Sequence, residues 1–224
     1  MFAVIFEVHP AADQWNSYIG VAKMLRPELQ AVEGFVDNVR YRSLSRDGWI
    51  LSLSGWRDEK ALVRWRTKAQ HHGAQEVGRG EILQDYHLRV GQITADSHVP
   101  AGHRLREQRL DETVVGEGTT IVLLDGKRTS EWVAENGADG VAQWLGIDPE
   151  LPGLVSWDAF DAVLTPGDVI ALSTWRHQHS AQAFADDVIL AEGVRRRIVR
   201  VVRDYGMYDR REAPQYYPEV PDRR

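Results

Sequence analysis

Leu53-Ser54-Gly55-Trp56-Arg57 is repeated 119 positions later as Leu172-Ser173-Thr174-Trp175-Arg176. The same offset holds without a gap back to Gly34 and Gly153, and 7 of the 24 paired positions are identical. A unit that occurs twice in one chain usually cannot bury its apolar surface alone, so the other copy is its natural partner. The sequence therefore predicts two related halves that pack on one another.

Both halves show the same order of elements. In the first half, apolar periodicity and turn residues predict strands over 2–8, 34–44, 49–56 and 82–93, with helices that begin near Trp15 and after Asp58. Pro27 is expected to kink or end the first helix early. The order is βαββαβ. In the second half we expect strands near 119–124, 153–163, 167–175 and 195–203, and helices near 129–145 and 177–190.

Composition divides the chain into four segments. The stretch 95–118 is polar and without period, which indicates a linker. The carboxyl-terminal stretch mixes prolines with tyrosines, so it cannot be a helix and is expected to lie extended over one of the domains. We therefore predict domains over 1–94 and 119–206, a linker over 95–118 and a tail over 207–224.

Composition also limits the possible partners. The chain has 224 residues, a formal net charge of -6 and no cysteine. Disulfides, thiolate nucleophiles and iron–sulfur clusters are excluded, and an acidic balance does not favour nucleic acid. We see no signal peptide and no apolar run long enough to span a bilayer, so we expect a soluble cytoplasmic protein without membrane or nucleic-acid partners.

The strand patterns predict how the two halves meet. A βαββαβ unit places both helices on one face of its sheet and leaves the other face bare. The runs 50–54 and 169–172 carry apolar residues on both alternating faces, so both faces should be buried. We predict an α+β fold in which the two bare sheet faces pack together as a closed or nearly closed barrel within one chain.

Several motifs of the first half carry a family resemblance: Gly34-Phe35-Val36, 40–43, 50–59, Trp65, His71-His72 and 85–90. Together they resemble the antibiotic biosynthesis monooxygenase family. The resemblance covers about residues 1–94 well and 119–206 more weakly. It implies two ferredoxin-like repeats forming a dimeric α+β barrel. The family includes cofactor-independent monooxygenases of polyketide quinones and haem-degrading monooxygenases.

Trp65 and His72 are the first candidates for catalysis. They are seven residues apart, so on one helix they lie about 20° from one another. His72 is placed to act as a general base or as an axial ligand to iron, with Trp65 as a stacking wall. His71, turned by about 120° from Trp65, is the weaker partner. Alternatively, His72 ends an amphipathic helix and Trp65 is core.

Other polar residues are candidates for substrate binding. Arg40 is a candidate to hold an enolate or a carboxylate, and Tyr86 to donate to a carbonyl, although a solvated strand face explains both as well. Ser52 and Ser54 line a pocket wall or hydrogen-bond within the sheet. Trp56 ends a strand like its repeat Trp175, for which a structural role is favoured. The predicted set is catalytic His72, Trp65 and Arg40, with Asn38, Tyr41, Ser52, Ser54, Trp56, His71 and Tyr86 around the substrate.

The resemblance implies an enzyme that oxidises an aromatic or polycyclic small molecule with O₂, without metal, flavin or another cofactor. Its alternative is a haem-degrading monooxygenase with His72 as the axial ligand. Against haem, the first strand lacks the Asn that haem-degrading members carry there. A non-catalytic binding module is the third hypothesis, because a fold does not fix a function. A homodimer of two-domain chains is possible.

Overall fold

Eight antiparallel strands close into one barrel in the computed structural model of this chain, which describes residues 1–221. The strand order around the barrel is β1-β3-β2-β6-β7-β5-β8-β4. The first half contains β1 (Phe2–Pro10), α1 (Trp15–Gln30), β2 (Phe35–Ser43), β3 (Ile50–Trp56), α2 (Glu59–Arg66), α3 (Ala69–Val77), the π-helical turn η1 (Gly78–Ile82) and β4 (Leu83–Asp96).

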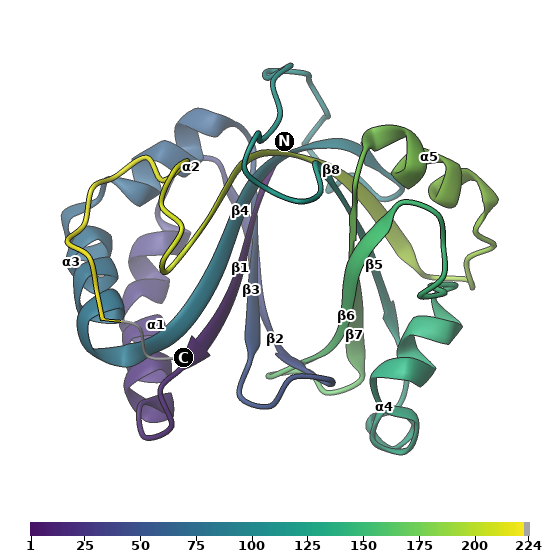
Figure 1. The fold of residues 1–224 in the computed structure, drawn as a ribbon, viewed down its shortest axis with the longest axis horizontal. Coiled ribbons are helices and arrows are strands. Elements are labelled where there is room, and N and C mark those ends of the chain that lie inside the picture. The colour runs from purple at the N-terminus through teal and green to yellow at the C-terminus, as the bar shows by residue number, and fades with distance from the viewer. Residues whose placement is uncertain (222–224) are drawn as a thin grey trace.

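The second half repeats this order with fewer helical segments. It contains β5 (Thr120–Lys127), α4 (Ser130–Trp144), β6 (Leu154–Ala162), β7 (Asp168–Trp175), α5 (Gln178–Asp187) and β8 (Arg195–Gly206). In Figure 1, α1, α2 and α3 cover the outer face of one sheet, and α4 and α5 cover the outer face of the other. The predicted α+β class and the intramolecular barrel are confirmed.

Two seams join the halves. β4 pairs with β8 over a long register that runs from His87 opposite Gly206 to Asp96 opposite Arg197. The shorter seam pairs β2 with β6, where Tyr41 lies opposite Ala162. Because every strand has a neighbour on both sides, the barrel leaves no open sheet edge that could pair with another chain.

The barrel interior is an apolar core built from both halves. Alternate residues of each strand point inward, as the period of two in a strand requires. Ile5, Leu51, Leu123, Phe160 and Val199 meet there and are almost completely buried. Burial of each such side chain contributes about 1.5–3 kcal/mol, so each half gains stability from the other.

Two expectations about helices were wrong. Pro27 lies inside α1, which continues to Gln30, because a proline near the end of a helix removes little of its hydrogen bonding. Trp65 and His72 do not share a helix. α2 ends at Arg66 and α3 begins at Ala69, so the chain turns between them and the seven-residue spacing no longer places both side chains on one face.

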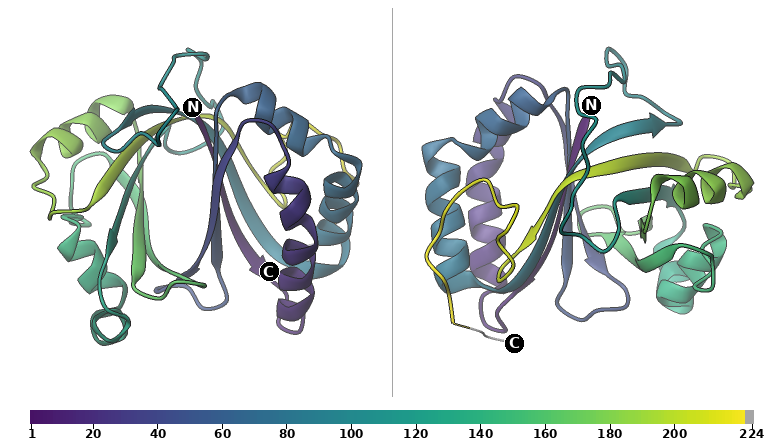
Figure 2. Two further views of the ribbon diagram at one scale, coloured as in Figure 1. Left: turned by 180° about the vertical axis from the view of Figure 1, so that it is seen from behind. Right: turned by 45° about the horizontal axis from the view of Figure 1, so that its top comes forward.

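The linker and the tail lie on the outside of the barrel. Figure 2 shows the linker crossing the end of the barrel near the N-terminus, and the tail running along α3. The linker is fixed there by the Thr113 N–H, which donates to the Val201 carbonyl at 2.8 Å. Residues 222–224 of the predicted tail lie outside the described residues. Among residues 1–221, no helix is long and apolar enough to cross a bilayer.

A substitution at Gly91 tests how tightly β4 and β8 pack at the longer seam. A Cβ atom at this position would lie 2.6 Å from the Arg200 carbonyl oxygen and would also overlap Val199 across the seam. We expect Gly91→Ala to lower the free energy of unfolding by about 2 kcal/mol or more, because backbone cannot move aside cheaply. Urea denaturation followed by tryptophan fluorescence measures the change.

Gly20→Ala is the matched control. Gly20 lies in α1 with no atom within 4 Å of the added Cβ. In a helix this change should raise the stability by about 0.5–1 kcal/mol. Equal unfolding midpoints for the two variants would contradict the tight packing at the seam.

Candidate functional site

The two helix-covered sheet faces differ in how well they are filled. We call the side of β1–β4 beneath α1, α2 and α3 the first face, and the side of β5–β8 beneath α4 and α5 the second face. On the first face, Val4 and Phe6 on the central strand β1 remain partly exposed, as do Ser52 and Leu88. On the second face, Val122, Leu124 and Ala171 match Val4, Phe6 and Ser52 by register and are each 0% exposed, whereas Arg196, the match of Leu88, is partly exposed. At three of these four positions the first face therefore has accessible surface beneath its helices where the second face is completely buried.

Side-chain volume at Asn38 and polarity at Arg40 distinguish the first face from the second. Asn38 and Arg40 on β2 correspond to Trp157 and Ala159 on β6, and Trp157 packs against the core of the second half. Asn38 Nδ2 donates to Ser52 Oγ and to the Leu53 carbonyl, both at 3.1 Å. Two of the predicted site residues, Asn38 and Ser52, are thus in contact on the first face.

Arg40 lies on the same face, and Tyr41 does not. Burial raises the pKa of the Tyr18 phenol on α1, and the nearby Arg40 guanidinium partly opposes that rise. The Nε of Arg40 is buried and has no hydrogen-bond partner among residues 1–221. Tyr41 points into the barrel core, where burial raises its pKa, and it is separated from Arg40 by the sheet.

His71, rather than His72, contacts Trp65. The two rings stack with centroids 4.2 Å apart, and His71 Nδ1 lies 3.2 Å from the Trp65 carbonyl oxygen. A carbonyl only accepts, so we assign the proton to Nδ1, which makes Nε2 the acceptor nitrogen of the ring. Burial lowers the pKa of His71 to about 4, so the ring is neutral at pH 7.

His72 faces the tail instead of the sheet. Its Nδ1 lies 3.0 Å from Tyr217 Oη, and its Nε2 lies 3.6 Å from a Glu76 carboxylate oxygen. Nδ1 is therefore hydrogen-bonded on the outer side of α3, and Nε2 lies beyond hydrogen-bond distance of Glu76. Because this ring lies against the tail and not on the first face, the residues present do not fit a haem held on that face by His72.

Trp56 and Ser54 form a repeated structural pair. Trp56 Nε1 donates to Ser54 Oγ at 3.0 Å, and Trp175 Nε1 donates to Ser173 Oγ at 2.9 Å. Trp56 is 0% exposed, so a substrate cannot touch it without moving the core. The identical bond in both halves supports a packing role for these residues.

Tyr86 lies on the first face at the opposite end from Trp65. Its ring meets Phe6 edge-on with centroids 5.6 Å apart. Its hydroxyl oxygen accepts hydrogen bonds from Arg79 and Arg210. Neither arginine stood out in the sequence, because Arg79 comes from a turn and Arg210 from the tail, where no periodic pattern points to a site.

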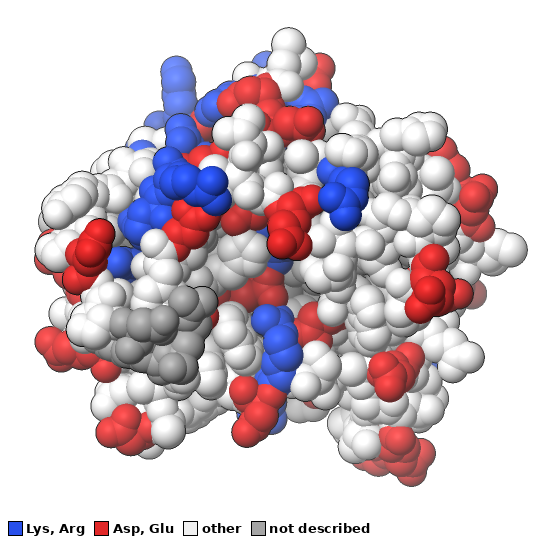
Figure 3. Space-filling view, in the orientation of Figure 1, with Lys and Arg blue, Asp and Glu red and all other residues white. Residues whose placement is uncertain are grey.

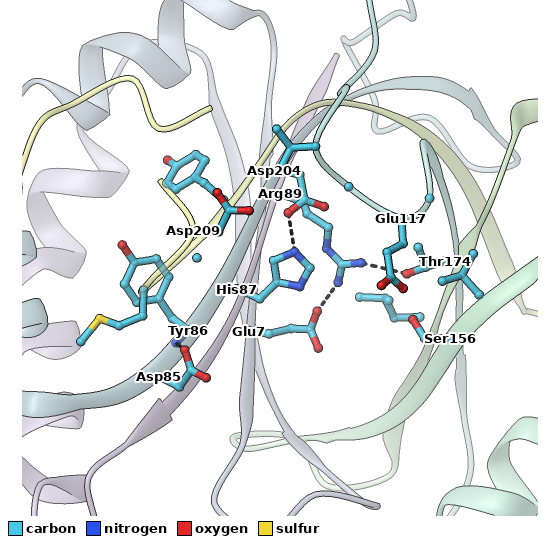
Figure 4. Close-up of a pocket in the computed structure, with 18 of the residues that line it drawn as sticks. Glu7, Asp85, Tyr86, His87, Arg89, Glu117, Ser156, Thr174, Asp204 and Asp209 are labelled. Carbon is cyan, nitrogen blue, oxygen red and sulfur yellow. Dashed lines mark hydrogen bonds and ion pairs between the residues drawn. The ribbon is translucent and has the colours of Figure 1, made fainter. Parts of the chain in front are cut away.

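A cavity of about 610 Å³ opens between the two halves at the mouth of the barrel. Figure 3 shows this region as a hollow with both acidic and basic side chains along it. Figure 4 shows Glu7, His87, Arg89, Thr174 and Asp204 pointing into it from β1, β4, β7 and β8. The alternation along β4, which separates His87 and Arg89 from Tyr86, was the sequence signal for this inward cluster.

The buried charges of this cavity neutralise one another. Burial alone raises the pKa of Glu7, but Arg89 and Arg46 outweigh it and hold the pKa below its ordinary value. Arg46 also bonds Asp158 at 2.7 Å, and His87 Nε2 lies 2.6 Å from Asp204. These contacts tie the two halves together without requiring a bound ion. Among residues 1–221, no group of three or more His, Asp or Glu side chains has an arrangement that could hold a metal.

His71 makes the stability of the first half depend on pH. Its pKa is about 4 in the folded state against an ordinary value of 6.5, so the unfolded chain binds more protons between these two pH values. Stability should therefore fall as the pH drops from 7 to 5, by about 1–2 kcal/mol from this group. Urea midpoints at both pH values should show a smaller fall in His71→Phe. His98→Asn, at an exposed histidine of the linker, should behave like the unaltered protein; an unchanged fall in His71→Phe would contradict the burial effect.

Comparison with known proteins agrees with the fold. The family model of the antibiotic biosynthesis monooxygenases matches residues 1–77. A protein of Pyricularia oryzae named jasmonate monooxygenase ABM is 50% identical over 226 residues, which cover 97% of this chain and 99% of that protein. The crystal structure of an aldoxime dehydratase has a TM-score of 0.52 at 13% identity, covering 89% of this chain and 80% of that chain, and supports the fold alone.

The family match and the name of this relative support a monooxygenase that acts on a small molecule. The near-complete coverage of both sequences at 50% identity extends the relationship beyond the first half to the whole barrel. The chain belongs to the antibiotic biosynthesis monooxygenase family.

Proposed function

We propose that this chain is a monooxygenase that oxidises a small, largely apolar molecule with O₂ on the first face, without a bound cofactor. The observation that supports this location is the contrast between the two faces. Phe6 and Ser52 are partly exposed beneath their helices, whereas Leu124 and Ala171 at the matching positions are completely buried. Binding sites for small molecules are largely apolar and carry a few directed polar groups, as this face does.

Two substrate types are candidates. The family resemblance implies an aromatic or polycyclic molecule. The 50% identical relative is named for jasmonate, which is a cyclic ketone with a carboxylate. Both types can carry a C–H bond next to a carbonyl or phenol, and such a bond is acidic enough to lose a proton to a base. We favour the jasmonate type because the identity extends over nearly the whole chain.

The residues of the first face have distinct roles in this proposal. His71 is neutral at pH 7 with Nδ1 directed at the Trp65 carbonyl, so its Nε2 accepts the proton from the acidic carbon. Because burial holds its pKa at about 4, the imidazolium that forms depends on the negative charge of the enolate beside it. Arg40, whose Nε has no partner among residues 1–221, stabilises the enolate that forms. Trp65 excludes water on one side. The carbanion then reduces O₂, a CH₂ group becomes C=O, and the second oxygen atom leaves as water, so the substrate supplies all the electrons.

We expect the purified protein to consume O₂ with jasmonic acid or with an anthrone, and to form no product under anaerobic conditions. Oxygen-electrode traces and mass spectrometry of the product measure this. His71→Phe should lower kcat by about 10²–10⁴-fold, because it removes the general base. Equal turnover with and without air would rule the proposal out. A haem Soret band lost in His72→Ala would favour the haem alternative, and a greater loss of kcat in His72→Ala than in His71→Phe would return the base to His72.

Filling the first face tests its role directly. Asn38→Trp inserts the side chain that the second half carries at this position, and we expect it to raise KM or abolish turnover by occupying the substrate's volume. The matched control is Trp157→Asn on the second face. It should destabilise the protein by about 3 kcal/mol while leaving KM unchanged. Loss of activity in the control but not in Asn38→Trp would move the site to the second half.

A further inference from the structure

Two arginines converge on a single phenol at one end of the first face. Arg79 Nη1 donates to Tyr86 Oη at 2.8 Å, and Arg210 Nη1 donates to the same oxygen at 2.6 Å. Arg79 comes from the π-helical turn η1 and is only 5% exposed. Arg210 comes from the tail and is half-buried. We call Arg79, Arg210 and Tyr86 the arginine cluster.

Every other acceptor of the arginine cluster is neutral. Arg79 donates to the Met207 carbonyl at 3.0 Å and to the Pro218 carbonyl at 3.4 Å. Arg210 donates to the Gln215 carbonyl at 3.1 Å. The Nε of Arg79 is buried and has no partner within residues 1–221. No carboxylate of that part of the chain forms an ion pair with Arg79 or Arg210, although the chain as a whole carries a net charge of -6.

A buried and a half-buried positive charge without a counter-charge lower the stability of the protein unless a negatively charged ligand binds beside them. A buried cation without a counter-charge loses its hydration, and a second cation beside it adds repulsion. The rings of Tyr86, Tyr205 and Tyr217, which lie 5.2–5.9 Å from the two guanidinium carbons, offset part of this cost but carry no negative charge. At the barrel mouth the equally buried Arg89 also has an Nε without a partner within residues 1–221, but its charge is compensated by the Glu7 carboxylate. The contrast indicates that the negative charge for the arginine cluster comes from a ligand.

The geometry favours a carboxylate. Because the Tyr86 oxygen accepts from both guanidinium groups, its hydroxyl hydrogen remains available to donate. Guanidinium groups match the two oxygens of a carboxylate, and charge-assisted bonds of this kind are strong. The Phe6 ring lies against Tyr86 and continues onto the accessible part of the first face, next to Leu88. The apolar remainder of a ligand whose carboxylate binds at the cluster would therefore lie along Phe6 and Leu88.

We propose that Arg79, Arg210 and Tyr86 bind the carboxylate of the substrate, and so select amphiphilic carboxylic acids over neutral molecules of the same shape. This specificity site rests on the proposed function, because it assigns one end of the same substrate. The tail is then part of the site, since it supplies Arg210 together with the Pro218 carbonyl that holds Arg79.

Binding of jasmonic acid and of its methyl ester to the full-length protein tests the proposal. The ester keeps the shape and removes the charge. Isothermal titration should show the acid binding about 10- to 100-fold more tightly than the ester. Arg210→Met should weaken binding of the acid by a similar factor, leave binding of the ester unchanged, and be partly rescued by Arg210→Lys.

Arg211→Met is the matched control, because Arg211 is the next residue along the tail and its exposed side chain pairs with Asp209 at 2.6 Å. It should leave both ligands unaffected. Thermal unfolding of the ligand-free proteins shows whether Arg210→Met is still folded. Failure of the acid to bind, equal binding of acid and ester, or an equal loss of acid binding in Arg210→Met and Arg211→Met would overturn the carboxylate site.

The outcome is independent of the oxidation chemistry. Arginine-dependent binding of the acid without O₂ consumption would leave the carboxylate site in place and reject the proposed function. Equal turnover of acid and ester, with equal KM, would retain the monooxygenase and reject the carboxylate site.

Discussion

The pairing of two bare sheet faces is the constraint on which the rest of the structure depends. Each half builds a four-stranded sheet with helices on only one side, so its other side must find an apolar partner. β4 with β8 and β2 with β6 close that contact into a barrel whose interior draws on both halves. Once the interior is shared, neither half needs a ligand or a second chain to complete its core.

A shared core also lets the two copies diverge. The second face is packed solid by Trp157 and the small Ala171, and Trp175 stacks on Phe184 with ring centroids 4.8 Å apart. The first face keeps Asn38, Arg40 and Ser52 in place of such packing. The well-packed second face adds stability to the chain. That gain offsets the stability lost through the polar groups and accessible surface of the first face. This division explains how one repeated unit can serve as scaffold in one copy and as a candidate site in the other.

Charge compensation separates structural clusters from candidate binding groups. At the barrel mouth, Glu7 lies between Arg89 and Arg46, and the pair His87 and Asp204 lies beside them (Figure 4). The opposite charges of those groups compensate one another, although Arg89 Nε has no hydrogen-bond partner within residues 1–221. Within the same residues, Arg79 and Arg210 contact only neutral groups. A buried charge without a counter-charge lowers stability, so its presence points to a ligand of opposite charge. A buried ion pair does not point to a ligand.

The repeat, the βαββαβ order, the α+β class and the closure of the barrel were all readable from the amino-acid sequence, because strand periodicity and turn residues are local signals. The residue contacts at the site could not be predicted from the sequence. The break at Thr67 and Lys68 moved His72 to the outer surface and brought His71 against Trp65, although the spacing favoured the reverse. Arg79 and Arg210 are 131 residues apart in sequence and meet only because the tail returns to η1. Local patterns determine elements, whereas the convergence of side chains from a turn, a strand and a tail depends on chain paths that only tertiary packing decides.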